Sequence, residues 1–218
     1  MPTLNAGETL PKTLATLGGS PIVREVIVAD GGSSDETVAC AGSAGAPIIV
    51  APRGRGSQLA AGAAAASGEW LLFLHADCHL EAGWESAVNA FVAPPEAARR
   101  AGYFDFVLDD DAPAARLLEH IVAWRCRVLA LPYGDQGLLI ARSLYEAVGG
   151  FAPLPLMEDV DFARRLGRPR LARIGAHCIA SARRYRRDGY LRRPLRNLLC
   201  LLLYFAGVPP ARIVRLYG

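Results

Sequence analysis

The sequence predicts an α/β protein whose central sheet is mostly parallel and carries helices on both faces. Apolar runs of strand-like composition at 22–29, 47–51 and 70–74 alternate with segments of helical composition. This alternation is typical of consecutive β-α-β units, and uninterrupted apolar runs are typical of strands that are buried on both faces. The chain has 218 residues, of which 52% are hydrophobic and 21% charged, so its composition suits one globular domain and excludes a disordered chain.

The remaining elements follow in order along the chain. We expect helices at 35–43, 57–66, 83–92 and 114–131, and a further strand at 103–108. Beyond Pro155 the sequence becomes arginine-rich, and there we expect helices only. No linker, repeat or low-complexity segment divides the chain, so we predict a single domain, 1–218, with a helical C-terminal appendage.

Composition also excludes several classes of protein. No run reaches the roughly 18–20 apolar residues that a membrane-spanning helix needs. The first residues lack the basic and apolar regions of a secretion signal, so we expect a cytoplasmic protein. The five cysteines contain no C-x-x-C pair, and we interpret them as reduced side chains of the core.

Charge is distributed unevenly. Residues 1–163 hold ten basic and twenty acidic side chains, whereas 164–218 hold fourteen arginines and one acid, Asp188. Such a basic tail predicts an anionic partner. Because its arginines precede the apolar run Leu198–Phe205, we expect it to dock on an anionic membrane surface; a core helix with a solvated arginine face is an equal alternative. Nucleic acid is not expected, since no aromatic stacking platform accompanies the arginines.

Ligands of parallel α/β sheets bind beyond the carboxyl ends of the strands. Asp30 ends the first apolar run and is followed by Gly31 and a second glycine, which let the backbone turn tightly and approach a ligand. The Asp30 carboxylate could accept hydrogen bonds from a base or a ribose. Ser34 or Asp35 is expected to cap the helix that follows.

His75 and Asp77 follow the run at 70–74. At strand spacing both side chains point to the same side, so both can reach one cation. This pair suits Mg²⁺ or Mn²⁺ that is held mainly by substrate phosphates, although a hydrogen-bonded loop would explain it as well. Further along, Glu158, Asp159 and Asp161 occupy the first turn of an expected helix. The helix dipole favours acids there, and one of them is a candidate general base.

Taken together, these segments resemble a family 2 glycosyltransferase of the GT-A fold. Within that family the chain resembles a bacterial subgroup labelled as arsenosugar-biosynthesis or radical-SAM-associated glycosyltransferases. The resemblance extends over nearly the whole chain and rests on Pro2–Asn5, Ala29–Asp35, Arg53–Gln58, Phe73–Asp77, Leu131–Gly137, Gly149–Phe151, Leu156–Asp159 and Ser181–Tyr185.

The resemblance implies a nucleoside diphosphate sugar donor in 1–110, an acceptor and catalytic half in 111–185, and a basic tail in 186–218. The residues that it assigns to the donor are Pro2, Thr3, Asn5, Asp30, Gly31, Arg53, Arg55, Gln58, His75 and Asp77. Those that it assigns to the hydroxyl acceptor are Gly134, Asp135, Gln136, Arg183, Arg184 and Tyr185. It also makes Asp77 the metal-binding acid, with His75 in place of the first acid of an Asp-x-Asp motif. It favours Asp159 over Glu158 as the base of an inverting transfer.

The chain departs from the family pattern in ways that keep two alternatives open. Members carry an apolar run before the Pro-x-x-Asn motif, so we expect the first strand to be shortened or absent here. Ala6, Ala60 and Tyr185 stand where the family has glutamate, asparagine and tryptophan. The alternatives are a nucleotidyltransferase on a similar sheet, which should carry an early glycine-rich triphosphate loop, and a catalytically silent peripheral membrane protein that retains the fold.

Overall fold

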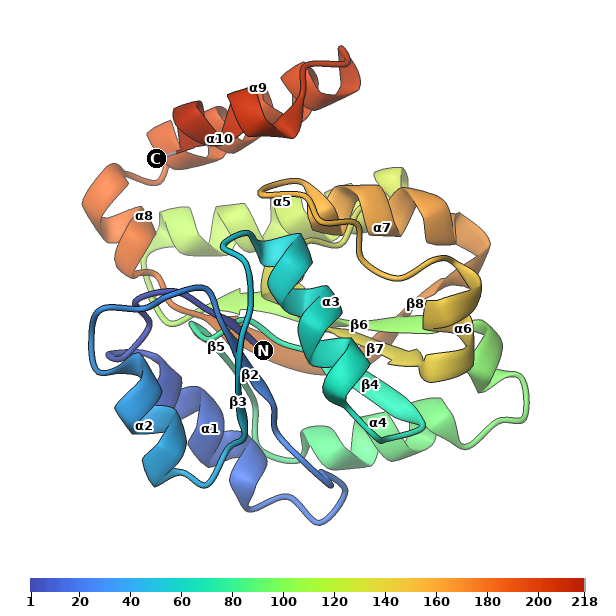
Figure 1. Ribbon diagram of the computed structural model, residues 1–218. Helices are drawn as coiled ribbons and strands as arrows, with labels where there is room; N and C mark the ends of the chain where they lie inside the picture. The colour runs from blue at the N-terminus through green and yellow to red at the C-terminus, as the bar shows by residue number, and fades with distance from the viewer. Residues whose placement is uncertain (218) are drawn as a thin grey trace.

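The computed structural model describes residues 1–217, which form two sheets packed among helices (Figure 1). The strands are β1 (Pro2–Thr3), β2 (Val28–Asp30), β3 (Ile48–Val50), β4 (Trp70–Phe73), β5 (Cys78–Leu80), β6 (Ala101–Leu108), β7 (Leu138–Ala141) and β8 (Leu171–Ala180). The α-helices are α1 (Leu10–Gly18), α2 (Thr37–Ser43), α3 (Arg55–Ala65), α4 (Trp84–Val92), α5 (Pro113–Leu129), α6 (Arg142–Ala147), α7 (Glu158–Leu166), α8 (Arg183–Asp188), α9 (Arg192–Phe205) and α10 (Pro210–Tyr217). Short 3-10 turns lie at η1 (Ala97–Arg99), η2 (Gly134–Gln136) and η3 (Arg168–Arg170).

The predicted α/β architecture is confirmed, with a difference in strand direction. The first sheet is parallel throughout, in the order β1-β2-β3. The second has the order β4-β7-β6-β8-β5, and within it only β6 and β8 run parallel. Parallel pairing therefore holds for two of the three apolar runs that led to the prediction, whereas the third, β4, pairs antiparallel with β7.

Two stretches differ from the expected elements. The apolar run at 22–29 forms a strand only from Val28, and 22–27 has no regular structure. The expectation of helices alone beyond Pro155 is wrong, because β8 is the longest strand of the fold as described. Its alternate residues Ile174, Ala176 and Cys178 are buried, and the arginines that precede them hid this period of two in the sequence.

The C-terminal helices belong to the domain instead of trailing from it. Cys200 and Leu201 of α9 and Ile213 of α10 are buried in one apolar cluster with residues around the start of α7. Figure 1 shows this helix pair above α5 and α7, at the rim of the molecule. No helix within residues 1–217 combines the length and the apolar character that crossing a bilayer requires.

Candidate active site

A cleft of about 650 Å³ lies beyond the carboxyl ends of β1 and β4 and beside the start of α3. Eight of the ten residues that the sequence assigned to a donor line it, namely Pro2, Thr3, Asn5, Arg53, Arg55, Gln58, His75 and Asp77. They come from three separate segments, so the fold assembles the motifs of the first half around one space, which we call the cleft.

Asp30 and Gly31 are not among the residues that line the cleft. Asp30 is 3% exposed, and its carboxylate accepts hydrogen bonds from the Thr3 hydroxyl and from the amides of Gly32 and Ser33, at 2.8–2.9 Å. Burial opposes ionisation of Asp30, but the bonds from Ser33, Thr3 and Gly32 together lower its pKa. The structure thus shows Asp30 holding β1 and the loop after β2 in place.

Gln58 is also a connecting side chain. It is 3% exposed, and its Nε2 donates to the carbonyl oxygens of Thr3 at 2.6 Å and Ala29 at 2.9 Å. One amide thereby ties α3 to both β1 and β2. The glycine that precedes it in α3 allows a second close approach, because a Cβ on Gly56 would lie 2.1 Å from the carbonyl oxygen of Ala152.

Arg55 and Glu158 form an ion pair between α3 and α7. Arg55 Nε lies 3.0 Å from Glu158 Oε1, and the Glu158 side chain is fully buried. Burial opposes the charge of Arg55, but the Glu158 carboxylate raises the pKa of this guanidinium above its ordinary value. Burial also raises the pKa of Glu158 to about 7, against the opposing effect of Arg55. Glu158 therefore positions Arg55 at the edge of the cleft.

His75 is a neutral imidazole at ordinary pH, because burial lowers its pKa to about 4. Its Nε2 is buried and has no hydrogen-bond partner within residues 1–217. That face of the ring lies against Gly134, where an added Cβ would come within 2.4 Å of Nε2. A side chain at this position would therefore force the His75 ring or η2 to move.

Asp77 offers the cleft a carboxylate with spare hydrogen-bonding capacity. Its side chain is 30% exposed, and the nearest cation, Arg184 Nη2, lies 3.9 Å from Oδ2. Among the described residues, no group of three His, Cys, Asp or Glu side chains could hold a metal ion by itself. Asp77, with neutral His75 beside it, fits a hard divalent cation only if oxygen atoms of a ligand complete the coordination.

A second, smaller hollow adjoins the cleft, and we call it the side pocket. The polar and aromatic residues that it shares with the cleft are Arg55, His75, Asp77, Ser181, Arg184 and Tyr217. Those that line the side pocket but not the cleft are Tyr133, Asp135, Asp159, Tyr185, Arg193 and Asn197.

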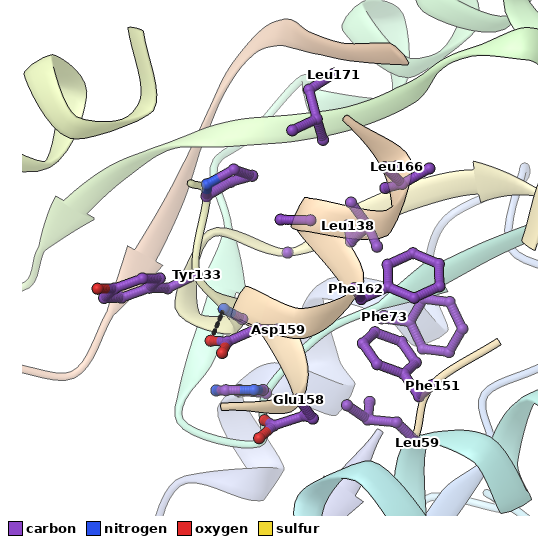
Figure 2. A pocket seen from close by; sticks show the side chains of 15 residues that line it. Leu59, Phe73, Tyr133, Leu138, Phe151, Glu158, Asp159, Phe162, Leu166 and Leu171 are labelled. Carbon is purple, nitrogen blue, oxygen red and sulfur yellow. Dashed lines mark hydrogen bonds between the residues drawn. The ribbon is translucent and has the colours of Figure 1, made fainter. Parts of the chain in front are cut away.

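Asp159 faces the side pocket from the first turn of α7. Its Oδ2 accepts from the amide of Gly134 at 2.9 Å (Figure 2), and its Oδ1 accepts from the amide of Val160 at 2.8 Å. Each oxygen keeps a further lone pair, so the two amides fix the orientation of the carboxylate and leave it able to accept another hydrogen bond or a proton. Figure 2 shows Glu158 beside it, and an apolar cluster that includes Phe151 and Phe162 on the opposite side of the helix from Asp159.

Asp135 lies across the side pocket on η2. Burial raises the pKa of Asp135 to about 6, and its Oδ1 has no partner in the described part of the chain. Its neighbour Gln136 does not line the pocket: it is 2% exposed and bonds to Arg125, at 3.0 Å, and to the Phe104 carbonyl, at 3.1 Å. Of the residues assigned to an acceptor, Asp135, Arg184 and Tyr185 line the side pocket.

The other two assigned acceptor residues lie at its margins. Gly134 packs on His75, as described above, and lines the apolar cavity behind α7. Arg183 lines the cleft and pairs with Glu8.

Sequence reasoning missed three residues of the basic tail that line the side pocket: Arg193, Asn197 and Tyr217. Arg193 is 5% exposed, donates to Asp188 at 2.9 Å, and lies 5.6–5.7 Å from the ring centroids of Tyr185 and Tyr217. One signal could have found it. Asp188 is the only acid among fourteen arginines in 164–218, so its partners were candidates for ordered positions.

Comparison with known proteins finds a similarity in the first half of the chain. Residues 1–106 match the family model described as Glycosyl transferase family 2. An uncharacterized glycosyltransferase of Mycobacterium tuberculosis is 37% identical over 84 residues, which is 38% of this chain and 37% of that protein. A Mycobacterium bovis glycosyltransferase, also uncharacterized, gives the same values. The match thus spans little more than a third of these relatives.

Solved structures extend the likeness to nearly the whole chain. Glucosyl-3-phosphoglycerate synthase from Mycobacterium tuberculosis, crystallised with Mn²⁺, UDP and glucosyl-3-phosphoglycerate, has a TM-score of 0.62 at 23% identity and covers 95% of this chain and 78% of its own. TarS from S. aureus has a TM-score of 0.64 at 15% identity, with coverage of 99% and 67%. The chain therefore has the GT-A fold, and residues 1–106, just under half of the chain, are similar to glycosyltransferase family 2.

Proposed function

We propose that the protein transfers a sugar from a nucleoside diphosphate sugar to an acceptor hydroxyl, with inversion at the anomeric carbon. The observation that carries the proposal is that Asp77 and Asp159 face the same side pocket, next to a cleft built from the motifs of the first half. The Asp77 carboxylate lies where the side pocket joins the cleft, and the Asp159 carboxylate lies at the start of α7. A sugar bound between them would contact both carboxylates.

The proposal assigns the proton transfer to Asp159 and not to Glu158. Asp159 lines the side pocket with free lone pairs, whereas Glu158 is fully buried, paired with Arg55 and absent from the lining. The acceptor oxygen forms a bond to the anomeric carbon as its proton passes to Asp159. The bond from that carbon to the diphosphate breaks at the same time, and its electron pair leaves with the diphosphate.

Arg55 and Arg53, which lie along the cleft, would stabilise the charge that develops on the departing diphosphate. Asp77, with His75 beside it, would hold Mg²⁺ or Mn²⁺, and when bound this ion supplies Lewis-acid stabilisation of the leaving group. The likeness to a synthase that was crystallised with Mn²⁺ and UDP-glucose supports a nucleotide donor and a divalent ion here.

The acceptor is proposed to bind in the side pocket between Tyr133, Tyr185 and Tyr217, with Asp135 accepting one of its hydroxyl hydrogens. Resemblance to the arsenosugar-biosynthesis subgroup stays a prediction, as does hexosyl transfer. A nucleotidyltransferase is not favoured, because the matching family and the similar structures named above are glycosyltransferases.

Thermal-shift titration with UDP, GDP, dTDP and CMP, each with Mn²⁺, Mg²⁺ or a chelator, tests donor binding first. We expect one nucleotide to raise the melting temperature in a metal-dependent way. Turnover of the corresponding UDP- or other nucleotide sugar, with the anomeric configuration of the product read by NMR, then tests the mechanism. A product of retained configuration would contradict the role of Asp159.

We also propose that the outer face of the α9–α10 pair rests on an anionic membrane surface. The inner face of the same helix pair contributes to the side pocket. Large apolar side chains of α9, and of Leu191 directly before it, are 48–72% exposed on this outer face: Leu191, Leu195, Leu198, Leu199, Leu202 and Phe205. Exposed Arg192, Arg212 and Arg215 accompany them. An apolar stripe flanked by arginines suits the boundary between lipid headgroups and acyl chains, and a second positively charged copy would be repelled.

Sedimentation with phosphatidylglycerol vesicles tests the proposed contact of the α9–α10 pair with a membrane. Leu202→Asp should abolish binding, whereas Leu117→Asp, at an equally exposed leucine of α5, should not. Binding that is equal on neutral phosphatidylcholine vesicles, or unaffected by Leu202→Asp, would contradict it.

A further inference from the structure

Helix α5 has apolar side chains on two sides. Its inner side packs into the core through four buried residues, Ala115, Leu118, Val122 and Cys126. Its outer side carries four large apolar side chains that are 43–63% exposed: Leu117, Ile121, Trp124 and Val128. We call these four residues the α5 stripe. A helix that only covers a sheet needs one apolar side, so the fold of a single copy leaves the stripe unexplained.

The spacing of the stripe is that of a helix packed against another helix. Its members follow one another at intervals of four, three and four residues. This spacing keeps the four side chains in one line of about 16 Å along the helix, and it is the spacing of the apolar seam between two paired helices. None of the four lines the cleft or the side pocket. The stripe is therefore separate from the candidate active site and has the pattern of a contact surface.

The two ends of the stripe carry opposite charges. Just before α5, exposed Asp111 follows Asp109 and Asp110. At the other end Arg127 is exposed, and its carbonyl oxygen accepts from Arg168 Nη2 at 2.6 Å, which brings a second exposed arginine to this end. Within residues 1–217, neither Asp111 nor Arg127 forms an ion pair. Both charged groups are thus available to a partner.

This distribution of charge fits a second copy of the chain. When two copies of α5 lie antiparallel, the acidic end of each faces the basic end of the other, so both ends attract. An anionic membrane would instead be repelled by the acids at one end. The outer face of the α9–α10 pair differs, since 189–217 contain arginines and no acid. The charges therefore favour a membrane at the α9–α10 pair and a second copy at the α5 stripe.

We propose that the protein forms a two-fold dimer in which the α5 stripe packs antiparallel against the α5 stripe of a second copy. At this spacing Ile121 of each copy contacts Trp124 of the other, and Leu117 contacts Val128. Burial of these apolar side chains supplies the attraction, and the charged ends fix the orientation. A contact of one helix per copy lies at the low end of interface sizes, so we expect a reversible dimer with a dissociation constant of about 1–100 µM.

Sedimentation equilibrium of the full chain, from about 1 to 300 µM, tests the dimer independently of the proposed transfer reaction. The parent should pass reversibly from monomer to dimer over this range. Ile121→Asp puts a carboxylate in the middle of the apolar contact on each copy, so the dissociation constant should rise about 100-fold or more. Val38→Asp, at a β-branched residue of α2 that is 44% exposed, is the matched control and should dimerise like the parent. A parent that stays monomeric at every concentration, or an Ile121→Asp protein that dimerises like the parent, would overturn the proposal.

Charge reversal tests the antiparallel orientation. Asp111→Arg and Arg127→Asp each place like charges at both ends of the dimer, so each alone should weaken it about tenfold at low salt. An equimolar mixture of the two variants should recover most of the parental affinity, because in the mixed dimer each end again joins an acid to an arginine. Single variants that dimerise as tightly as the parent would contradict this orientation, as would a mixture that dimerises no more tightly than either variant alone.

Two further results would place the contact elsewhere. If Leu202→Asp of α9 abolishes the dimer while Ile121→Asp does not, the copies meet through the α9–α10 pair. If Ile121→Asp removes binding to phosphatidylglycerol vesicles and the parent stays monomeric, the stripe belongs to the membrane-facing surface. Either result would refute a dimer through α5.

Discussion

The cleft and the side pocket share a border but differ in how their polar groups are satisfied. Gln58 of the cleft and Asp30, which is buried beside it, form their hydrogen bonds with the protein itself and hold β1 in place. Around the side pocket, buried Asp135 Oδ1 and Asn197 Oδ1 have no partner among residues 1–217. Unpaired buried polar atoms are costly, so they mark where a ligand is expected to bind.

The difference indicates that the cleft is organised before any ligand binds, whereas the side pocket is completed by its ligand. Substitutions on the two sides should therefore separate in their effects. Substitutions at the cleft should change donor affinity. Substitutions at the side pocket should change turnover, or should stabilise the folded protein where they remove a buried polar atom that has no hydrogen-bond partner.

The largest expected effect is on turnover. Asp159→Asn removes the proposed base but keeps the shape of the side chain and one of its two acceptor oxygens, so kcat should fall by about 10²–10⁴-fold with little change in donor affinity. Steady-state kinetics and calorimetry with the donor nucleotide measure both quantities. Asp161→Asn, two residues along α7 and paired with Arg165, is the control and should keep most of the turnover. Loss of activity in Glu158→Gln alone would move the base to the neighbouring residue.

The next effect is on donor affinity. Asp77→Asn should weaken binding of the nucleotide about tenfold or more in the presence of Mn²⁺ and much less in a chelator, since it removes the proposed cation ligand. Calorimetric titration under both conditions measures it, with Glu96→Gln at an exposed position as control. Equal affinities of parent and variant with Mn²⁺ would show that Asp77 does not bind the ion.

The contact between Gly134 and His75, at the border of the cleft and the side pocket, can be tested through the free energy of unfolding. Gly134→Ala places a Cβ 2.4 Å from His75 Nε2, so the ring or η2 must move, at a cost of about 1–3 kcal/mol. Urea unfolding measures this cost. Gly42→Ala in α2 is the matched control, because an added Cβ there meets nothing within 4 Å. An unchanged free energy for Gly134→Ala would mean that the contact is more adaptable than its geometry indicates.

The cleft was largely predictable from sequence, because each of its motifs is a short segment directly after a strand. Asp30 shows the limit of that reasoning: the motif was found, but its burial and its four hydrogen bonds depend on Thr3 and Ser33, so its distance from the cleft could not be inferred. The side pocket was harder, since Arg193 and Tyr217 reach it through tertiary packing of α9 and α10. Similarly, β8 was missed because its pairing with β6 is non-local.

The smallest expected effect is the dependence of stability on pH that comes from Asp135. Burial raises its pKa from the ordinary 3.8 to about 6 in the folded protein. Between these values the folded state holds a proton that the unfolded state has lost, so this contribution is fully present below about pH 4 and disappears as pH rises through 6.

Asp135→Asn removes this titration while keeping a side chain of similar size. The free energy of unfolding of the parent, relative to the variant, should therefore fall by about 1–2 kcal/mol from pH 4 to pH 7. Urea unfolding of both proteins across this range measures the difference, and Asp111→Asn, at an exposed position, should show no such trend. A saturating acceptor that donates to Asp135 should shrink the dependence, because the carboxylate is then paired while ionised. If the free energy of unfolding of Asp135→Asn itself still falls from pH 4 to pH 7 as in the parent, the fall arises from another buried acid of this region, and Glu158 is the first to examine. Water would then reach the unpaired oxygen of Asp135.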